Sequence, residues 1–217
     1  MAPTVAWATI VVPTWANPLS GSKTAPETVP ATPSKCRLTQ YSLPGRYDKI
    51  TVACYYATGV TIPWVQFDSI TFIEATERTW GVLQVETEDP GGPYLRCHSA
   101  SSGSKTTYSP EHIKVTVGKP DWVNLHFEGE AGTVSGAVFD PASGFAQVGP
   151  TMVAKATAGA KVYGSIRFGQ TSAHGNHPDA KSQSYFSNII VDYTRGAFPL
   201  LPSGPAAATA PAAGGGK

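Results

Sequence analysis

The chain has 217 residues and a formal net charge of +1, with 16 basic and 15 acidic residues. Nucleic-acid binders gather Lys and Arg into a patch that meets phosphates, so this balanced, unclustered charge excludes such a partner. No apolar run approaches the roughly 18 residues of a membrane span, and 22 Gly and 19 Pro favour strands and turns over helices. The composition predicts a soluble, β-rich globular protein.

Residues 1–35 are rich in Pro and Thr and predict an extended arm, in which Val5–Val12 would add a strand to a sheet edge. The first residues carry no positive charge, and their apolar run is broken by Pro13 and contains Trp7 and Trp15, so no recognisable signal peptide is predicted. Residues 204–217 predict a flexible, low-complexity Ala/Pro/Gly tail. Residues 36–203 have no charged linker and no repeat, which predicts one β-sandwich domain.

Segments of alternating apolar and polar residues follow one another through this domain. In residues 47–56, Ile50, Val52 and Cys54 alternate with polar or small neighbours. The same pattern predicts strands at 64–75, 80–88, 93–99, 112–118, 122–129, 133–140, 144–149, 161–169 and 184–194. Alternation at this spacing is typical of an antiparallel sandwich or barrel, and no window shows a helical period.

The last of these strands, within SQSYFSNIIVDY at residues 182–193, is expected in the interior of a sheet. An uninterrupted strand places alternate side chains on opposite faces. One face would then carry Tyr185, Ile189, Val191 and Tyr193, and the other would carry Phe186 and Ile190.

The run WVNLHFEGEAGTVSGAVFDPASGFAQVG, which begins at Trp122, resembles the central hairpins of laminin-G-like, concanavalin A-like jelly-roll domains. In those domains a tryptophan-led strand is followed by a strand that ends in Asp and a turn. The ending KVYGSIRFGQ and SQSYFSNIIVDYT is similar to their closing strands. The resemblance covers roughly residues 40–195 and implies an all-β, two-sheet antiparallel jelly-roll sandwich. It implies no single function, because lectins, glycosidases, lyases, adhesion modules and structural proteins share this fold.

Enzymatic candidates are judged by their acidic pairs, because a glycosidase needs two carboxyl groups facing one cleft. Glu74 and Glu77 point to opposite sheet faces, and Arg78 would keep both ionised. Glu86 and Glu88 share a face but lie at a turn edge. The Arg, Gln, His and Tyr set that a lyase would need on its concave sheet is not found as a motif. Catalysis is therefore not expected, although the sequence leaves the question open.

Ligand-binding residues are predicted from aromatic side chains at strand ends, where rings can stack on sugars. The stacking candidates are Tyr94 and Tyr108, which border the loop 99–109, and Trp64 and Trp80, for which a core or arm-anchoring position is the simpler interpretation. Trp122 is expected in the core instead. The remaining strand histidines, expected at surface or cross-strand positions, are His98, His112 and His126.

No cofactor is indicated, with calcium as the alternative, because loop carboxylates can supply its oxygen ligands. The candidate donors are Asp89, Asp140 and Asp179. The loop AHGNHPDA brings His174 and His177 beside Asp179 as a candidate ligand site, although a solvated turn is the simpler interpretation. The cysteines Cys36, Cys54 and Cys97 show no metal-binding spacing, and Cys54 is expected to be a small buried hydrophobic residue. Their disulfide state stays open.

These observations favour a non-catalytic recognition module that binds a glycan or an extracellular surface. The alternative is a self-assembling structural protein, such as a virion surface, decoration or coat protein or a filament subunit, because the uncharged arm and tail suit contacts between copies. A polysaccharide hydrolase or lyase is the second alternative. The expected partners are a glycan or copies of the chain itself, with no nucleic acid and no membrane span. The expected location is extracellular or virion-associated.

Overall fold

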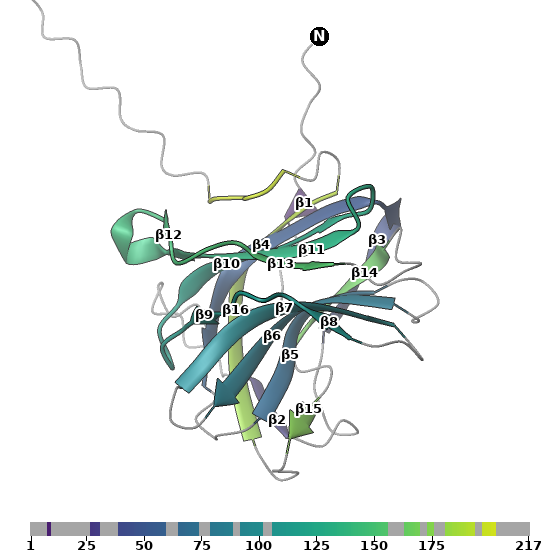
Figure 1. Cartoon of the computed structure of the whole chain (residues 1–217). Helices are drawn as coiled ribbons and strands as arrows, with labels where there is room; N and C mark the ends of the chain where they lie inside the picture. Colours follow the sequence, from purple (N-terminus) through teal and green to yellow (C-terminus); the bar gives the residue numbers. More distant parts are fainter. Residues whose placement is uncertain are drawn as a thin grey trace, which may run out of the picture.

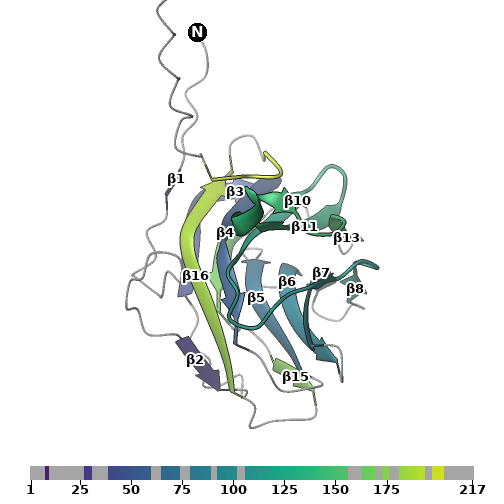
Figure 2. The ribbon, with the colours of Figure 1, turned by 90° about the vertical axis from the view of Figure 1, so that its left-hand side faces the viewer.

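The computed structural model describes residues 8–9, 27–30, 39–59, 65–73, 79–88, 92–101, 106–155, 163–169, 173–175, 181–193 and 197–202. These residues form two antiparallel β-sheets packed face to face, which confirms the predicted all-β, two-sheet jelly-roll sandwich (Figure 1, Figure 2). Within these ranges the helical element is one 3-10 turn, η2 (Pro141–Ser143), and no helix there is long and apolar enough to cross a membrane.

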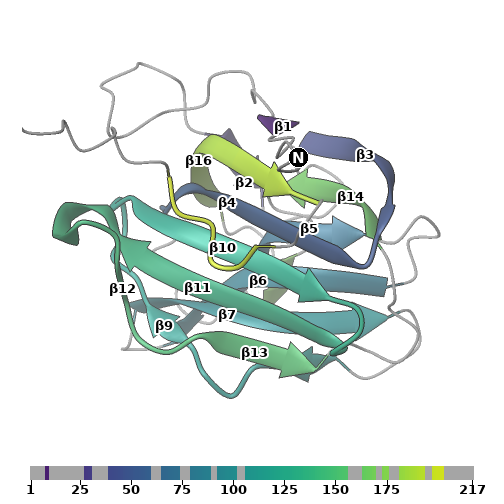
Figure 3. The same ribbon diagram turned by 90° about the horizontal axis from the view of Figure 1, so that it is seen from above.

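The first sheet has the strand order β1-β16-β4-β10-β11-β12, with β2 paired to β16 and β13 paired to β11 (Figure 3). Its strands are β1 (Ala8–Thr9), β2 (Glu27–Pro30), β4 (Lys49–Thr58), β10 (Asp121–Glu128), β11 (Thr133–Asp140), β12 (Ala146–Gln147), β13 (Met152–Lys155) and β16 (Lys181–Asp192). The edge strand predicted for Val5–Val12 corresponds to β1, which pairs with β16. The arm also contributes β2, which sequence reasoning missed.

The second sheet has the order β3-β14-β5-β6-β7-β8, with β15 paired to β5 and β9 paired to β7. Its strands are β3 (Thr39–Tyr47), β5 (Val65–Ile73), β6 (Thr79–Glu88), β7 (Gly92–Ser101), β8 (Thr107–Tyr108), β9 (Ile113–Lys114), β14 (Tyr163–Phe168) and β15 (Ala173–Gly175). The strand predicted at 112–118 is therefore only β9. It is short because the segment crosses between the sheets: Val115 N donates to Pro93 O, whereas Gly118 N donates to Thr58 O of β4.

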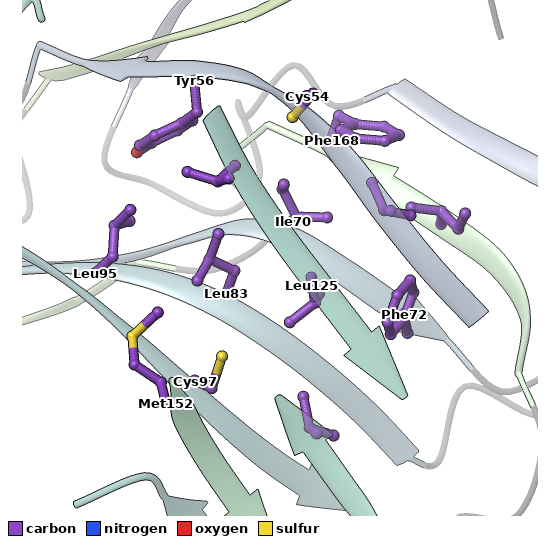
Figure 4. Packing of buried hydrophobic residues seen from close by; sticks show 14 of the residues in the cluster. Cys54, Tyr56, Ile70, Phe72, Leu83, Leu95, Cys97, Leu125, Met152 and Phe168 are labelled. Atoms are coloured by element: carbon purple, nitrogen blue, oxygen red, sulfur yellow. The ribbon is translucent and has the colours of Figure 1, made fainter. Parts of the chain in front are cut away.

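The core lies between the two sheets, where alternate side chains of every long strand meet (Figure 4). As predicted, Ile50, Val52 and Cys54 point into this core from β4. Cys97 of β7 joins them, and burial raises the pKa of both thiols far above the usual range. Among the described residues both cysteines are free thiols. The prediction that Cys54 is a small buried hydrophobic residue is confirmed.

Gly136 of β11 allows the two sheets to approach each other closely. A Cβ atom built at this position would overlap Cys97 Sγ of the opposite sheet and lie 3.0 Å from Met152 Cε. Glycine is disfavoured within strands unless another group approaches closely. The glycine in TVSGAVFD is thus explained by packing between the sheets.

Strand β16 corrects the predicted distribution of its side chains. Phe186 was expected on the face opposite Ile189 and Val191, but all three are buried in the core between the sheets. The reason is a β-bulge: the register with β4 shifts between Ser187 and Ile190, and Asn188 has a φ of 51°. One extra residue reverses the alternation.

A second, smaller cluster covers the outer face of the first sheet. Trp122 is buried as predicted, but it belongs to this outer cluster with Ala53, Ala137, Phe139 and Leu200. The C-terminal segment 197–202, which we call the strap, crosses β10 here (Figure 3).

The strap also buries His126, which sequence reasoning placed at a surface or cross-strand position. His126 is a cross-strand residue, because its Nδ1 lies 2.8 Å from Thr51 Oγ1 on β4. It is not a surface residue: only 7% of it is exposed, and its ring stacks on Phe198 at 5.0 Å. Of the two predicted positions the cross-strand one therefore holds, and the strap covers the residue with a second layer.

Candidate functional site

The outer face of the second sheet carries polar and aromatic side chains. Leu83, Val85, Leu95 and Cys97 point into the core from β6 and β7. Because side chains alternate along a strand, their neighbours point outward. The outward set that we call the tyrosine–arginine face consists of Glu86, Tyr94, Arg96, His98 and Tyr108.

Strand register fixes the layout of this face. A transverse row runs through Arg167, Thr71, Val82, His98 and Tyr108, all paired in register. Four strand spacings of about 4.8 Å make this row about 19 Å long. A second row places Glu86 opposite Tyr94, and Tyr94 opposite Lys114. Register therefore brings together groups that lie far apart in the sequence, of which Thr71, Val82 and His98 are buried and Tyr108 is exposed.

Arg96 organises one end of the face. Its Nε donates to Ser109 O at 2.9 Å, and its Nη1 lies 3.4 Å from Glu86 Oε1. The guanidinium carbon lies 4.6 Å from the centre of the Tyr108 ring, within the range of a cation–π contact. Arg96 thus holds the β8 strand and the Tyr108 ring beside β7.

The two tyrosines predicted as ligand-binding residues both lie on this face. Tyr108 is 38% exposed, and its ring centre is 5.3 Å from that of His98. Tyr94 is half-buried and meets the His112 ring edge-on at 4.8 Å. His112 is exposed, in line with the prediction, and His98, with 6% exposure, takes the cross-strand alternative, because it pairs in register with Val82 and Tyr108. The structure places Tyr94 and Tyr108 on the same sheet face, and their role in binding stays a prediction.

The four residue types named above for a lyase occur on one face of the second sheet, although no sequence motif contains them. Gln84, Arg96, His98 and Tyr108 lie on one face of the second sheet, and Gln84 is in register with Arg96. No linear motif reveals this set, because β6, β7 and β8 contribute it jointly. The alternation in WGVLQVETE and PYLRCHS carried the only signal, since Gln84, Glu86, Arg96 and His98 occupy outward positions.

Of the two acidic residues considered on β6, Glu86 and Glu88, the first forms an ion pair with Arg96. Glu86 is 8% exposed, and its carboxylate pairs with Arg96. Glu88 ends the same strand. Glu74, Glu77 and Arg78 lie outside the described residues.

The remaining predicted site residues are only partly covered by the structure. Trp80 lies in β6 opposite Ile73, and His174 lies in β15 opposite Gln66. The predicted site residues outside the described residues are Trp64, Asp89, His177 and Asp179. Cys36, whose disulfide state was left open, also lies outside them.

Asp140 caps the turn η2 and takes part in a charge cluster. Its Oδ1 accepts a hydrogen bond from Ala142 N and lies 3.2 Å from Lys119 Nζ. Lys119 Nζ also lies 3.3 Å from Asp121 Oδ1. The bond from Lys119 holds the pKa of Asp140 below its ordinary value. In the described part of the chain no group of three or more His, Cys, Asp or Glu is placed to hold a metal.

Solved structures with a similar fold were found. A sialidase matches over 76% of this chain with 13% identity and a TM-score of 0.50, and this chain spans 15% of the sialidase. The chain has a concanavalin A-like jelly-roll fold. The CBM2 module of the evolved Dit protein from Lactobacillus casei BL23 phage J-1 is similar over 72% of this chain and 67% of its own, with 5% identity and a TM-score of 0.47.

The carbohydrate-binding module CBM66 from Bacillus subtilis is similar over 71% of this chain and 81% of its own, with 8% identity and a TM-score of 0.45. No family model matches the sequence. No curated protein matches it either.

Proposed function

We propose that the protein is a non-catalytic glycan-binding module and that the tyrosine–arginine face binds the sugar chain. The observation that carries this proposal is the placement of Tyr94 and Tyr108 on one sheet face, with Arg96 between them. Tyrosine rings stack on the apolar faces of sugars, while charged groups bind their hydroxyl groups. From Tyr94 to His98, which pairs with Tyr108, the strand rises about 13 Å at about 3.3 Å per residue. An extended oligosaccharide could contact both rings.

Polysaccharide retention in affinity electrophoresis tests this proposal. The wild-type chain should be retarded by at least one polysaccharide, and Tyr94→Ala and Tyr108→Ala should each weaken binding about tenfold, equivalent to 1.4 kcal/mol. Val153→Ala is the control, because Val153 is 41% exposed on β13 of the other sheet. Binding that survives both tyrosine substitutions would place the ligand elsewhere.

A lyase acting on an acidic polysaccharide is the second candidate, favoured by Gln84, Arg96, His98 and Tyr108 on one face. In β-elimination a base removes the proton from the carbon that bears the carboxyl group, and a double bond forms between this carbon and the next one. The bond from that next carbon to the leaving oxygen breaks as an acid protonates the oxygen. His98 and Tyr108 would share these proton transfers. The test is ultraviolet absorbance of unsaturated sugars, which should appear with wild type and disappear with Tyr108→Phe. No absorbance with any polyuronate would contradict this candidate.

The laminin-G-like relationship of residues 40–195 stays a proposal. Self-assembly through the arm stays an alternative proposal for the function. Self-assembly is supported by β1 and β2, because both add to β16 at the edge of the first sheet. A strand that pairs with an exposed edge can also be supplied by a neighbouring copy. Light scattering after size-exclusion chromatography would measure the mass, and a monomer at all concentrations would contradict this alternative.

A further inference from the structure

We infer that the glycan bound by the tyrosine–arginine face is acidic, and that its sugar carboxylates bind Arg96 and Lys114. This inference rests on the proposed function and adds the chemical class of the ligand. Both tyrosines of the face, exposed Tyr108 and half-buried Tyr94, lie beside a cation: Arg96 lies over the Tyr108 ring, and Lys114 lies opposite Tyr94 in register. A sugar that stacks on either ring would bring its substituents next to a positive charge.

The guanidinium of Arg96 is only partly engaged by the protein. Its Nε and Nη1 bind Ser109 O and Glu86, whereas Nη2 has no polar partner among the described residues. The Arg96 side chain remains 28% exposed. Since a guanidinium presents its donors in a planar fork, a free edge of this kind suits a carboxylate.

Lys114 supplies the second cation. It lies opposite Tyr94 in the pairing of β7 with β9, is exposed, and makes no ion pair with the described part of the chain. Strand geometry places its Cα about 8 Å from that of Arg96, two residues along and one strand across. Two cations at this spacing could engage separate charged sugars of one polymer.

The charges around the tyrosine–arginine face follow from strand register. Its carboxyl residues are Glu86, which pairs with Arg96, Asp68, which lies opposite Gln84, and Glu88, which lies opposite Gly92. Glu111 adds one carboxylate in the loop between β8 and β9, with Oε2 buried. Lys114 makes no ion pair with the described residues and lies opposite Tyr94, so it is the cation that an anionic ligand would meet at that ring.

The test compares polymers that differ in charge alone. Polygalacturonate should bind the full-length chain at least tenfold more tightly than the same polymer after its carboxyl groups are reduced to alcohols, and added salt should weaken binding. Equal binding of the two polymers would overturn the acidic specificity while leaving glycan binding intact. Binding of neither polymer, nor of any in a wider panel, would overturn the proposed function as well. Equal binding of polyglutamate would show charge attraction without sugar recognition and would also overturn the inference.

Charge-removing variants locate the binding site. Lys114→Gln and Arg96→Gln should each weaken polygalacturonate binding about tenfold, whereas binding of the reduced polymer should change little. Lys155→Gln is the matched control, because Lys155 is an exposed lysine on β13 of the other sheet. Arg96 also holds Ser109, so Lys114→Gln, at an exposed position, decides the question if Arg96→Gln fails to fold. Unchanged binding by Lys114→Gln would overturn the role of Lys114. A heparin arm would show whether sulfates replace carboxylates, and tighter binding of heparin than polygalacturonate would overturn the choice of carboxylates.

Discussion

The indole nitrogen of Trp122 donates a hydrogen bond to the carbonyl oxygen of Leu200, 2.7 Å away and 78 positions later in the chain. The backbone nitrogen of Leu200 in turn donates to Asn124 Oδ1 at 2.7 Å. Both polar groups of one strap residue are thus held by outward side chains of β10. Ala53 and Ala137 flank Asn124 in register, and their small size leaves room for the Leu200 side chain.

Weakening the strap should destabilise the whole domain. We expect Leu200→Ala to lower the free energy of unfolding by about 2–5 kcal/mol, because a buried leucine is lost. Trp122→Phe should lower it by about 1–3 kcal/mol, since Leu200 O loses its donor. Urea unfolding measures both, with Leu201→Ala as the control at a residue that is 43% exposed. Leu200→Ala values no larger than those of the control would show that the strap is not part of the cooperative unit.

The close approach at Gly136 predicts a coupled pair of substitutions. Gly136→Ala should cost about 1–3 kcal/mol, because the added methyl group overlaps Cys97 Sγ. In a Cys97→Ala background the same change should cost much less, which a double-mutant cycle measures. Gly164→Ala is the control, since its nearest atoms would lie at 3.7 Å. Additive effects would contradict a direct clash.

The bulge in β16 predicts which side chains of this strand contribute most to the free energy of unfolding. Ile189→Ala and Phe186→Ala should each lower the free energy of unfolding by at least about 2 kcal/mol, because both side chains are 2% exposed in the core. Ile190→Ala should cost less, since Ile190 is only half-buried on the opposite face. A loss above that of Ile189→Ala would place Ile190 in the core and remove the bulge.

His126 predicts a loss of stability in acid. Burial lowers its pKa from the ordinary 6.5, so the unfolded chain takes up a proton more readily than the folded chain does. Its contribution is therefore complete above pH 6.5 and declines as the pH falls through 6.5 toward the lower folded pKa. Thermal unfolding at stepped pH should show this decline, reduced in His126→Gln. A profile unchanged by the substitution would assign the acid sensitivity to other groups.

The free thiols predict selective protection from alkylation. Cys54 and Cys97 are fully buried, and their raised pKa keeps them protonated. Peptide mapping after iodoacetamide treatment should find both unmodified in the native protein and modified in urea. Rapid native labelling of either residue would show that the core opens locally.

Sequence reasoning predicted the sandwich because the apolar residues that alternate along β4, β6 and β10 are those that face the core between the sheets. It did not predict the second layer or the extra residue. His126 looks like a surface residue until Phe198 covers it, and Phe186 changes face because Asn188 lies in a bulge.

The tyrosine–arginine face was only half predictable. Tyr94 and Tyr108 could be proposed from their positions, but their proximity to Arg96 and Lys114 depends on which strands pair. Pairing between β7, β8 and β9 is a long-range property that local alternation does not contain.

The strap has a practical consequence for attaching the protein to a surface. It anchors the chain at Leu200 on the outside of the first sheet, whereas the tyrosine–arginine face lies outside the second. An affinity tag or sensor linkage added after the strap would therefore attach the protein through the side of the first sheet. The tyrosine–arginine face, on the opposite side, would point away from the surface. Coupling through lysine side chains would instead consume Lys114 itself.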